Sequence, residues 1–502
     1  MSRIPESSIQ GLTYNALDSA ITFQVMEGFW KEINGGGYDI QYGRTIELLD
    51  PLMYMMTRGI RIDHERLKVV AKETLELTAE KQAKLNSMAG RELNVASAPQ
   101  MMNYFYYERD ISPYKNSKGK PTCDDKALTR LARGTSSRKP IPEAKLCQEI
   151  RTLRKSYGTY LDMSFDDDGR FRTSCNPRGT VTGRISSGKT INDTGMNMQN
   201  LPELFKKFMV PDEGYLLIEM DKRQAEWVVV AYECGDANMI AVLEDGQDPH
   251  THTAHLMFGV DKDLIKAEAK IVGHTTDPSE IESLRRKGCP EILNAGFVPR
   301  IFSMRQAGKK SNHALNYDET YKRFAFENEM SEKESKVIVD RYYKIYPGIR
   351  SNYETIQNQL RKNRTLSNCF GSKRVFLDKF GPDLFKAAYA YKPQSTVGEL
   401  VNQALITVYQ DHNVGVRDVE LLAQVHDSIL FQIPLSLPTT EILAGIKGVE
   451  DALNPQMEYW GREFTIPSDI KMGTCSWGTL PEYNLYDKQA LGAAIDEFKR
   501  AG

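Results

Sequence analysis

The hydrophobic pattern is most informative between Tyr215 and Asp236, where the sequence is YLLIEMDKRQAEWVVVAYECGD. The apolar run Leu216 to Ile218 predicts a short buried strand, and the second apolar run, after Asp221, predicts a helix. An acid at such a junction has two explanations, because it can cap the first N–H groups of the helix or bind a metal ion. This stretch alone leaves both open.

The remaining pattern alternates between helical and mixed regions. Helices are predicted for Tyr14 to Ile33, 64 to 88, Leu146 to Leu161 and 300 to 346. Strands and turns are predicted from Arg170 onward, Ala423 to Pro434 predicts a hairpin, and Asp469 to Gly478 predicts a last strand. Residues 260 to 299 are charged and irregular, which fits an insertion that contacts DNA or a partner as well as it fits a disordered surface loop.

Composition places the chain among soluble globular proteins. It has 502 residues, 40% hydrophobic and 26% charged, with a net charge of −2. The apolar run Trp227 to Tyr232 is far shorter than the roughly 20 residues that cross a bilayer, so no membrane contact is expected. The seven cysteines are scattered without a C-x-x-C pair, which is typical of a reducing, cytoplasmic compartment. Basic clusters such as Arg300 to Lys310 leave room for a phosphate-binding cleft.

Two motifs are set aside because of their context. Gly183 to Thr190, GRISSGKT, matches the Walker A pattern, but neither a preceding hydrophobic strand nor a following helix is predicted. His250, His252 and His255 have a spacing that could hold a metal ion, yet no zinc signature is completed nearby. Solvated or helix-packed histidines are the favoured interpretation.

Four side chains recur at every fourth residue between 305 and 317. They are Arg305, Lys309, His313 and Tyr317. On a helix each step of four advances about 6 Å and turns little, so the four share one face. A solvated basic face is the ordinary explanation for the two cations alone. Two cations followed by two rings suit a polyphosphate with a base stacked beside it.

A second acid occupies a predicted hairpin turn. His426 and Asp427 lie between two strongly apolar runs, where Asp is also favoured for local hydrogen bonding. With such flanks this carboxylate must be paired or bind a cation. Asp221 and Asp427 at strand tips, with a basic helix between them in the chain, match the needs of two-metal phosphoryl transfer. Oxygen ligands favour two Mg²⁺ ions, with Mn²⁺ as an alternative.

These residues resemble the motifs of family A (Pol I-like) DNA polymerases. Asp221-x-x-Gln224-x-Glu226 resembles motif A, Arg305-x-x-x-Lys309 with Tyr317 resembles motif B, and Gln424 to Asp427 resembles motif C. Gly179 to Ser187, Met198 to Pro202, Leu93 to Leu131 and the region of Gln394 resemble further family elements. The resemblance covers roughly residues 50 to 502.

The resemblance implies an α+β right-hand polymerase that copies primed DNA with dNTPs. It implies residues 1–44 as the tail of a 3′–5′ exonuclease-like domain, 45–155 as thumb, 156–245 and 394–502 as palm, and 246–393 as fingers. Asp221 and Asp427 would hold the metal ions and Lys309 would be a proton donor to pyrophosphate. The residues implied to bind dNTP are Arg305, Lys309, His313, Tyr317, Gln224 and Glu226, the last blocking a ribose 2′-OH. Those implied to hold primer and template are Arg184, Gln199, Asn200, Gln394 and His426.

Four positions depart from the family pattern. His313 stands in place of Phe or Tyr, Lys222 in place of an aromatic residue, Asp318 in place of glycine, and Ser428 in place of an acid. The His-Asp-Ser sequence also resembles single-subunit RNA polymerases, which are therefore the alternative enzyme, although Glu226 favours DNA. A non-catalytic DNA-binding replisome subunit is the non-enzymatic alternative.

The N-terminal region carries a fragment of a second motif. Tyr14-x-x-x-Asp18 resembles the last motif of the 3′–5′ exonuclease that precedes this polymerase, and the earlier acids of that domain are absent. We therefore expect proofreading to come from a separate exonuclease polypeptide, and a processivity factor is a further expected partner. A compact polymerase of this kind favours a viral, phage-encoded replicase acting in the host cytoplasm.

Overall fold

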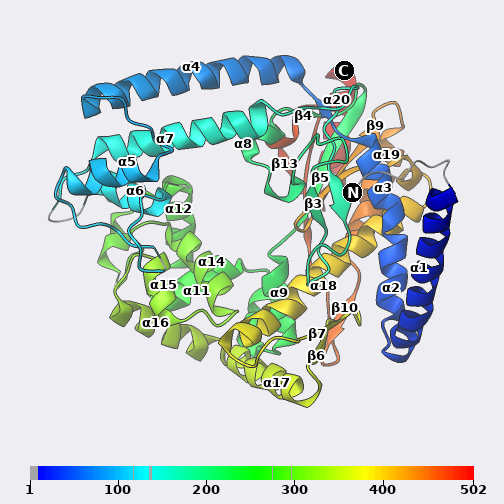
Figure 1. Cartoon of the computed structure of the whole chain (residues 1–502). Coiled ribbons are helices and arrows are strands. Elements are labelled where there is room, and N and C mark those ends of the chain that lie inside the picture. Colours follow the sequence, from blue (N-terminus) through cyan, green and yellow to red (C-terminus); the bar gives the residue numbers. More distant parts are fainter. Residues whose placement is uncertain (1–8, 117, 135–137, 274, 296, 502) are drawn as a thin grey trace.

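The computed structural model describes residues 9–116, 118–134, 138–273, 275–295 and 297–501. The protein has an α+β fold in which one antiparallel sheet lies between several groups of helices (Figure 1). No helix in these ranges is long and apolar enough to cross a membrane.

The central sheet has five antiparallel strands in the order β13-β12-β5-β9-β8. The strands are β5 (Tyr215–Lys222), β8 (Glu420–Val425), β9 (Ser428–Pro434), β12 (Ser468–Gly473) and β13 (Glu482–Tyr483). The predicted strand after 215 and the predicted hairpin after 423 are confirmed, and β5 and β9 pair along their whole length, from Tyr215 opposite Pro434 to Asp221 opposite Ser428.

Both faces of β5 are covered near its start, which explains its continuous apolar run. Leu216, Ile218 and Met220 are fully buried in a large core that includes α9 (Ala225–Glu233), α18 (Pro382–Gln410) and α19 (Thr439–Leu453). Leu217 points to the opposite face, into a second core with Phe205. Residues 219 and 221 follow Leu217 on that second face.

A helical arm extends away from the sheet (Figure 1). It consists of α4 (His64–Ala89), α5 (Ala98–Met102), the π-helix η1 (Asn103–Tyr107), α6 (Asp125–Arg133), α7 (Pro142–Ser156) and the π-helix η2 (Tyr157–Leu161). The long helix predicted for 64 to 88 is confirmed as α4. Residues such as Leu85, Phe105 and Ile150 form a core of the arm's own.

A second helical group follows α9 and lies below the arm in Figure 1. Its helices are α10 (Ala237–Glu244), α11 (Pro249–Phe258), α12 (Lys262–Val272), α13 (Pro278–Gly288), the 3₁₀ turn η4 (Pro290–Asn294), α14 (Met304–Leu315), α15 (Tyr321–Glu327), α16 (Glu332–Ile345) and α17 (Pro347–Asn363). The arm contacts this group through three ion pairs: Lys126 with Glu327 at 2.8 Å, and Arg130 and Arg133 with Glu329 at 3.8 and 3.1 Å.

The remaining elements are short or peripheral. The helices are α1 (Ile9–Gly35), α2 (Asp39–Glu47), α3 (Leu49–Arg58), α8 (Glu203–Lys206) and α20 (Lys488–Ala501), and the 3₁₀ turns are η3 (Met198–Asn200), η5 (Val416–Asp418) and η6 (Trp477–Thr479). Four pairs of short strands complete the fold: β1 (Arg61–Ile62) with β4 (Met209–Val210), β2 (Ser174–Asn176) with β3 (Ser186–Gly188), β6 (Thr365–Ser367) with β7 (Lys373–Val375), and β10 (Met457–Tyr459) with β11 (Arg462–Phe464). The first eight residues of the predicted 1–44 tail lie outside the described ranges.

The structure decides one alternative that the sequence left open and corrects two expectations. Of the two explanations for Asp221, the capping of α9 is excluded, because β5 continues through Lys222 and Gln224 is the N-cap residue. Residues 260 to 299 are not irregular, since Asp261 and Asp277 accept N–H hydrogen bonds that start α12 and α13. The strand predicted near the C-terminus is present as β12, but β13 and α20 follow it.

Candidate active site

The sheet brings Asp221 and Asp427 together although they are far apart in sequence. Asp221 is the penultimate residue of β5, and Asp427 lies in the turn between β8 and β9. Asp221 pairs with Ser428, the residue after Asp427, and the Lys222 amide donates to the Asp427 carbonyl at 3.3 Å. Both acids line a pocket of about 300 Å³ together with Glu219 and Lys471.

A bound cation would stabilise the ionised carboxylates of this pocket. Burial, followed by the negative charge of Asp427, raises the pKa of the Asp221 carboxyl well above its usual range. Burial likewise raises the pKa of Asp427. Two half-buried carboxylates in one pocket are suited to a bound divalent ion, and their oxygen atoms are the ligands that Mg²⁺ prefers. No cluster of three or more His, Cys, Asp or Glu suited to a metal ion occurs in the described residues.

A network of amides fixes the turn that carries Asp427. His426 has a φ of +54°, in the left-handed region. Its amide donates to Gln199 Oε1 at 2.8 Å, and its carbonyl accepts from Gln424 Nε2 at 2.6 Å. Gln199 Nε2 donates to the Gln424 carbonyl at 2.9 Å, so η3 is tied directly to the hairpin. The structure therefore places Gln199 and His426 beside the acids.

The basic helix predicted from the four-residue spacing is α14, although it is shorter than expected. Arg305, Lys309 and His313 share one face of α14, whereas Tyr317 lies beyond its end at Leu315. Asp318 follows with a φ of +58°, which accounts for a glycine being usual there and for Asp, which tolerates this region, replacing it. Burial lowers the pKa of His313, which disfavours the charged ring.

Arg305 is oriented by an acid that sequence analysis missed. Its Nε and Nη2 donate to the two oxygens of Asp248 at 2.9 and 3.0 Å. Gln224 Nε2 donates to the same carboxylate at 2.7 Å, and Asp248 also caps α11 by accepting from the Thr251 amide. Although burial opposes it, the hydrogen bonds and charge of these donors, Arg305 above all, lower the pKa of Asp248 to about 2.

Glu226 links two other residues of the predicted site. Tyr317 Oη donates to Glu226 Oε2 at 2.6 Å, and Arg184 Nη2 donates to Glu226 Oε1 at 2.6 Å. Burial and the Glu226 charge raise the pKa of Tyr317 well above its usual range, which keeps its hydroxyl a donor. The carboxylate is therefore held at both oxygens in one orientation.

His250 lies with the basic helix rather than in a metal site. It is buried, and its Nδ1 is 3.0 Å from Asn312 Nδ2 of α14. Its ring centroid is 6.3 Å from that of His313. Burial is the main cause that lowers the pKa of His250 to about 3. The other two histidines of α11 contact Gln247 and the Val260 carbonyl, so helix-packed histidines are confirmed.

Lys222, which departs from the family pattern, follows Asp221 and has a buried side chain that links the end of β5 to other segments of the chain. Its Nζ donates to the Leu453 carbonyl at 2.7 Å and to Ser468 Oγ at 3.1 Å, and also to the Ile466 carbonyl and Asn454. Burial lowers its pKa to about 7, while the charge of Asp427 opposes that shift. An aromatic ring would leave these acceptors without a cationic donor.

The remaining predicted residues lie on several different elements. Gln394 is half-buried on α18, and Asn200 is exposed at the end of η3. Gly183 to Thr190 forms β3 and a turn in which Lys189 pairs with Asp193 at 2.8 Å, so the rejection of a phosphate loop is confirmed. Ser428 is buried and donates to the Val425 carbonyl at 3.0 Å.

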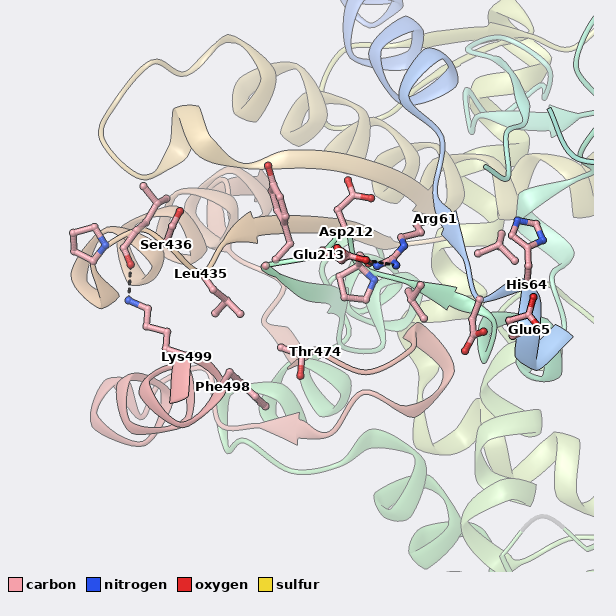
Figure 2. Close-up of a pocket in the computed structure, with 18 residues that line it drawn as sticks. Arg61, His64, Glu65, Asp212, Glu213, Leu435, Ser436, Thr474, Phe498 and Lys499 are labelled. Carbon is pink, nitrogen blue, oxygen red and sulfur yellow. Dashed lines mark hydrogen bonds and ion pairs between the residues drawn. The ribbon is translucent and has the colours of Figure 1, made fainter. Parts of the chain in front are cut away.

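A larger pocket of about 1060 Å³ lies between β1, β4 and α20 (Figure 2). Its lining includes Arg61, which pairs with Glu213 at 2.8 Å, and Lys499, which donates to the Leu437 carbonyl. Because these charges are satisfied within the protein and neither Asp221 nor Asp427 lines it, the smaller acidic pocket is the candidate active site.

Comparisons with known proteins find one family of similar sequences. A sequence model of DNA polymerase family A matches residues 64–273 and 301–477. The thermostable DNA polymerase I of Thermus aquaticus is 25% identical over 440 residues, which are 83% of this chain and 46% of that protein. DNA polymerase I of Treponema pallidum (strain Nichols) is 26% identical over 483 residues, 93% of this chain and 43% of that protein.

The solved structure of the POL domain of Pol1 from M. smegmatis, in complex with DNA primer-template and dNTP, is similar in fold. Its TM-score is 0.68 at 22% identity, and the match covers 86% of this chain and 70% of that one. The chain spans less than half the length of the curated relatives it matches.

Proposed function

The chain belongs to DNA polymerase family A, and on this premise we propose that it extends the 3′ end of a DNA primer with dNTPs chosen by the template. The observation that carries the proposal is the meeting of Asp221 and Asp427 at adjacent strands in a chain of that family. Extension of a labelled primer by the purified chain with dNTPs and Mg²⁺ tests it, and failure to extend any primed template would contradict it.

We propose the right-hand arrangement of such polymerases for this fold. The sheet with β5, β8 and β9 would be the palm, the arm from α4 to α7 the thumb, and the helices from α11 to α17 the fingers. The separate core of the arm and its polar contacts with the fingers support independent movement of the two parts.

Asp221 and Asp427 are the residues that would hold two Mg²⁺ ions, because their carboxylates line one pocket and offer the oxygen ligands that Mg²⁺ prefers. Ions bound there would supply positive charge for phosphoryl transfer. The chain's own contribution is orientation: β5 and the β8–β9 turn fix both carboxylates, and the amide network of Gln199 fixes the turn. The acids are thus pre-arranged before substrate binds.

Arg305 and Lys309 would bind the triphosphate, with Lys309 donating a proton to the departing pyrophosphate. A guanidinium has five N–H donors, and Asp248 accepts from two groups of Arg305, so donors remain for phosphate oxygens. Gln224 would act through its bond to Asp248 rather than by direct contact. His313 and Tyr317 would adjoin the base and sugar of the incoming nucleotide.

For the primer and template side we propose Arg184, Gln199, Asn200, Gln394 and His426. Arg184 Nη2 donates to the Glu226 carboxylate at 2.6 Å, and 28% of the Arg184 side chain is exposed beside that carboxylate, so part of the guanidinium is accessible to nucleic acid. Gln199 and His426 lie in one network beside Asp427. These contacts would place a primer end next to the acids.

Replacing Glu226 by alanine is expected to weaken discrimination against ribonucleotides. The carboxylate, held by Tyr317 and Arg184, would block a 2′-OH, so its loss should lower the ratio of kcat/KM for dATP over ATP by about 10- to 200-fold. Glu226→Gln is the matched control, because it keeps the bulk of the side chain while its amide retains only one of the two acceptor oxygens. An unchanged ratio in Glu226→Ala would contradict the assignment.

We further propose that 3′–5′ excision is supplied by a separate polypeptide that contacts α1. This helix exposes large apolar side chains, among them Leu17, Phe23 and Phe29 at 56 to 59% exposure, beside the exposed Asp18. Exposed apolar surface of this extent marks a protein contact.

The purified 502-residue chain is accordingly expected to leave a mispaired primer end intact during incubation with Mg²⁺ and no dNTP. The measurement follows primer length on a denaturing gel, with a paired primer and the Asp18→Ala variant alongside. Robust shortening of the primer that disappears in Asp18→Ala would show that this chain carries the exonuclease itself.

A further inference from the structure

The start of α14 is held by a buried ion pair that involves a segment outside the family match. Glu268 lies on α12 and Arg285 on α13, with side-chain exposures of 0% and 3%. Residues 274–300, which include Arg285, fall between the two stretches that the family model matches. One partner of the ion pair, Arg285, therefore lies outside the matched stretches, and the other, Glu268, lies within the first of them.

The guanidinium of Arg285 binds both its partner and the chain that leads into α14. Nε and Nη2 donate to Glu268 Oε1 at 2.9 and 2.7 Å. Nη1 donates to the Pro299 carbonyl at 2.6 Å, and Nη2 donates to the Phe302 carbonyl at 2.8 Å. Four donor contacts from one rigid fork thus fix the path of the last residues before the helix.

Glu268 completes the arrangement from the other side. Its second oxygen, Oε2, accepts from the amide of Met304, the first residue of α14, at 2.9 Å. The first amides of a helix have no partner within the helix, and a negative charge at that end is stabilising. The Ser303 side chain caps the neighbouring Gln306 amide at 3.2 Å. Glu268 and Ser303 therefore fix the residue at which α14 begins.

The next residue along the helix is Arg305, whose guanidinium Asp248 holds from α11. A shift of the α14 start would move the Arg305 backbone relative to Asp248, and it would move Lys309 one turn later along the same helix. A buried ion pair is weak evidence for added stability, because apolar residues of similar volume often stabilise as well. Its specific bonds to Met304, Phe302 and Pro299 point instead to a role in placement.

We propose that Glu268 and Arg285 are positioning residues for nucleotide binding, which fix the start of α14 and through it the phosphate-binding side chains Arg305 and Lys309. The inference rests on the proposed function of those two cations. It assigns α13, which carries Arg285, a role in positioning α14, in place of a DNA-binding insertion or a surface loop.

The test compares the full chain with Arg285→Met, Arg285→Lys and the control Arg286→Met in single-nucleotide incorporation. Arg286 is adjacent but exposed, and its partner Glu282 lies on the same helix at 2.6 Å. Arg285→Met should raise KM for dNTP about tenfold, because small displacements of binding groups are costly, while Kd for primer-template changes less than about twofold. Arg286→Met should leave both constants unchanged.

Arg285→Lys keeps the charge but loses the fork, so it should fold and still show a KM raised by several-fold. Thermal unfolding followed by circular dichroism identifies which variants are folded. If Arg285→Met does not fold, the KM of Arg285→Lys decides the test. A folded Arg285 variant with the wild-type KM would overturn the inference while leaving the polymerase proposal intact. Wild-type protein that incorporates no dNTP would instead overturn the proposed function and this inference with it.

Discussion

Asparagine in place of Asp221 or Asp427 is expected to reduce primer extension by at least about a thousandfold, because each change removes a charged oxygen from the pair that would hold the metal ions. The measurement is the single-turnover rate of adding one templated nucleotide. Asp469→Asn is the matched control: Asp469 lies directly opposite Asp221 on β12, but its side chain pairs with Arg223. That control should keep a rate close to wild type, and Asp variants within tenfold of wild type would refute the assignment.

The same substitutions are also expected to raise the thermal stability of the protein, although they lower its activity. A raised pKa in the folded protein means that the ionised carboxylate is less favourable there than in the unfolded chain. The protonated carboxyl therefore contributes favourably to the free energy of unfolding at low pH, and this contribution is lost as the pH rises through the pKa of the folded protein. Without divalent ions at pH 8, Asp221→Asn should therefore unfold at a higher temperature than wild type, although it is inactive. A lower unfolding temperature would indicate that the lost activity reflects damage to the fold.

Methionine in place of Lys222 is expected to destabilise the protein by about 2–4 kcal/mol. The substitution keeps the length of the side chain but leaves the carbonyls of Leu453 and Ile466 without their donor, and a buried acceptor without a partner costs about 1–3 kcal/mol. Denaturant unfolding at pH 7 measures the loss. A change below about 0.5 kcal/mol would mean that these contacts do not hold the end of β5.

Lys471→Met is the matched control for that experiment. Lys471 lies on the neighbouring strand β12 and pairs with Glu219 at 3.4 Å, but 44% of its side chain is exposed. Pairs exposed to this degree contribute about 0–1 kcal/mol, so this variant should remain close to wild type in stability. The difference in unfolding free energy between the two variants distinguishes a set of buried hydrogen bonds from a surface ion pair in the same sheet.

Local patterns predicted the elements that carry the site, because the signals concerned lie within a few residues of one another. The apolar runs around Asp221 and Asp427 predicted β5 and the β8–β9 hairpin correctly. The four-residue spacing from Arg305 predicted α14, but not that the helix ends at Leu315, before Tyr317. The register that sets Asp221 opposite Ser428 depends on long-range pairing that no local pattern contains.

The residues missed in the sequence are those whose partners lie on other elements. Asp248 was overlooked because its role depends on Arg305, which lies on α14 and not on its own helix. Glu219 could have been found, since it is two residues before Asp221 and therefore faces the same side of β5. The helices within 260–299 could also have been found from Asp261 and Asp277, each of which begins a capped helix.

The most direct test of templated synthesis at the Asp221–Asp427 site offers each of the four dNTPs singly, with Mg²⁺, on four primed templates that differ only in the next base. We expect one-nucleotide extension wherever the dNTP matches the template base, little extension with the matching NTP, and none by Asp427→Asn. Extension regardless of the template base, equal use of NTPs, or full activity in Asp427→Asn would contradict this expectation.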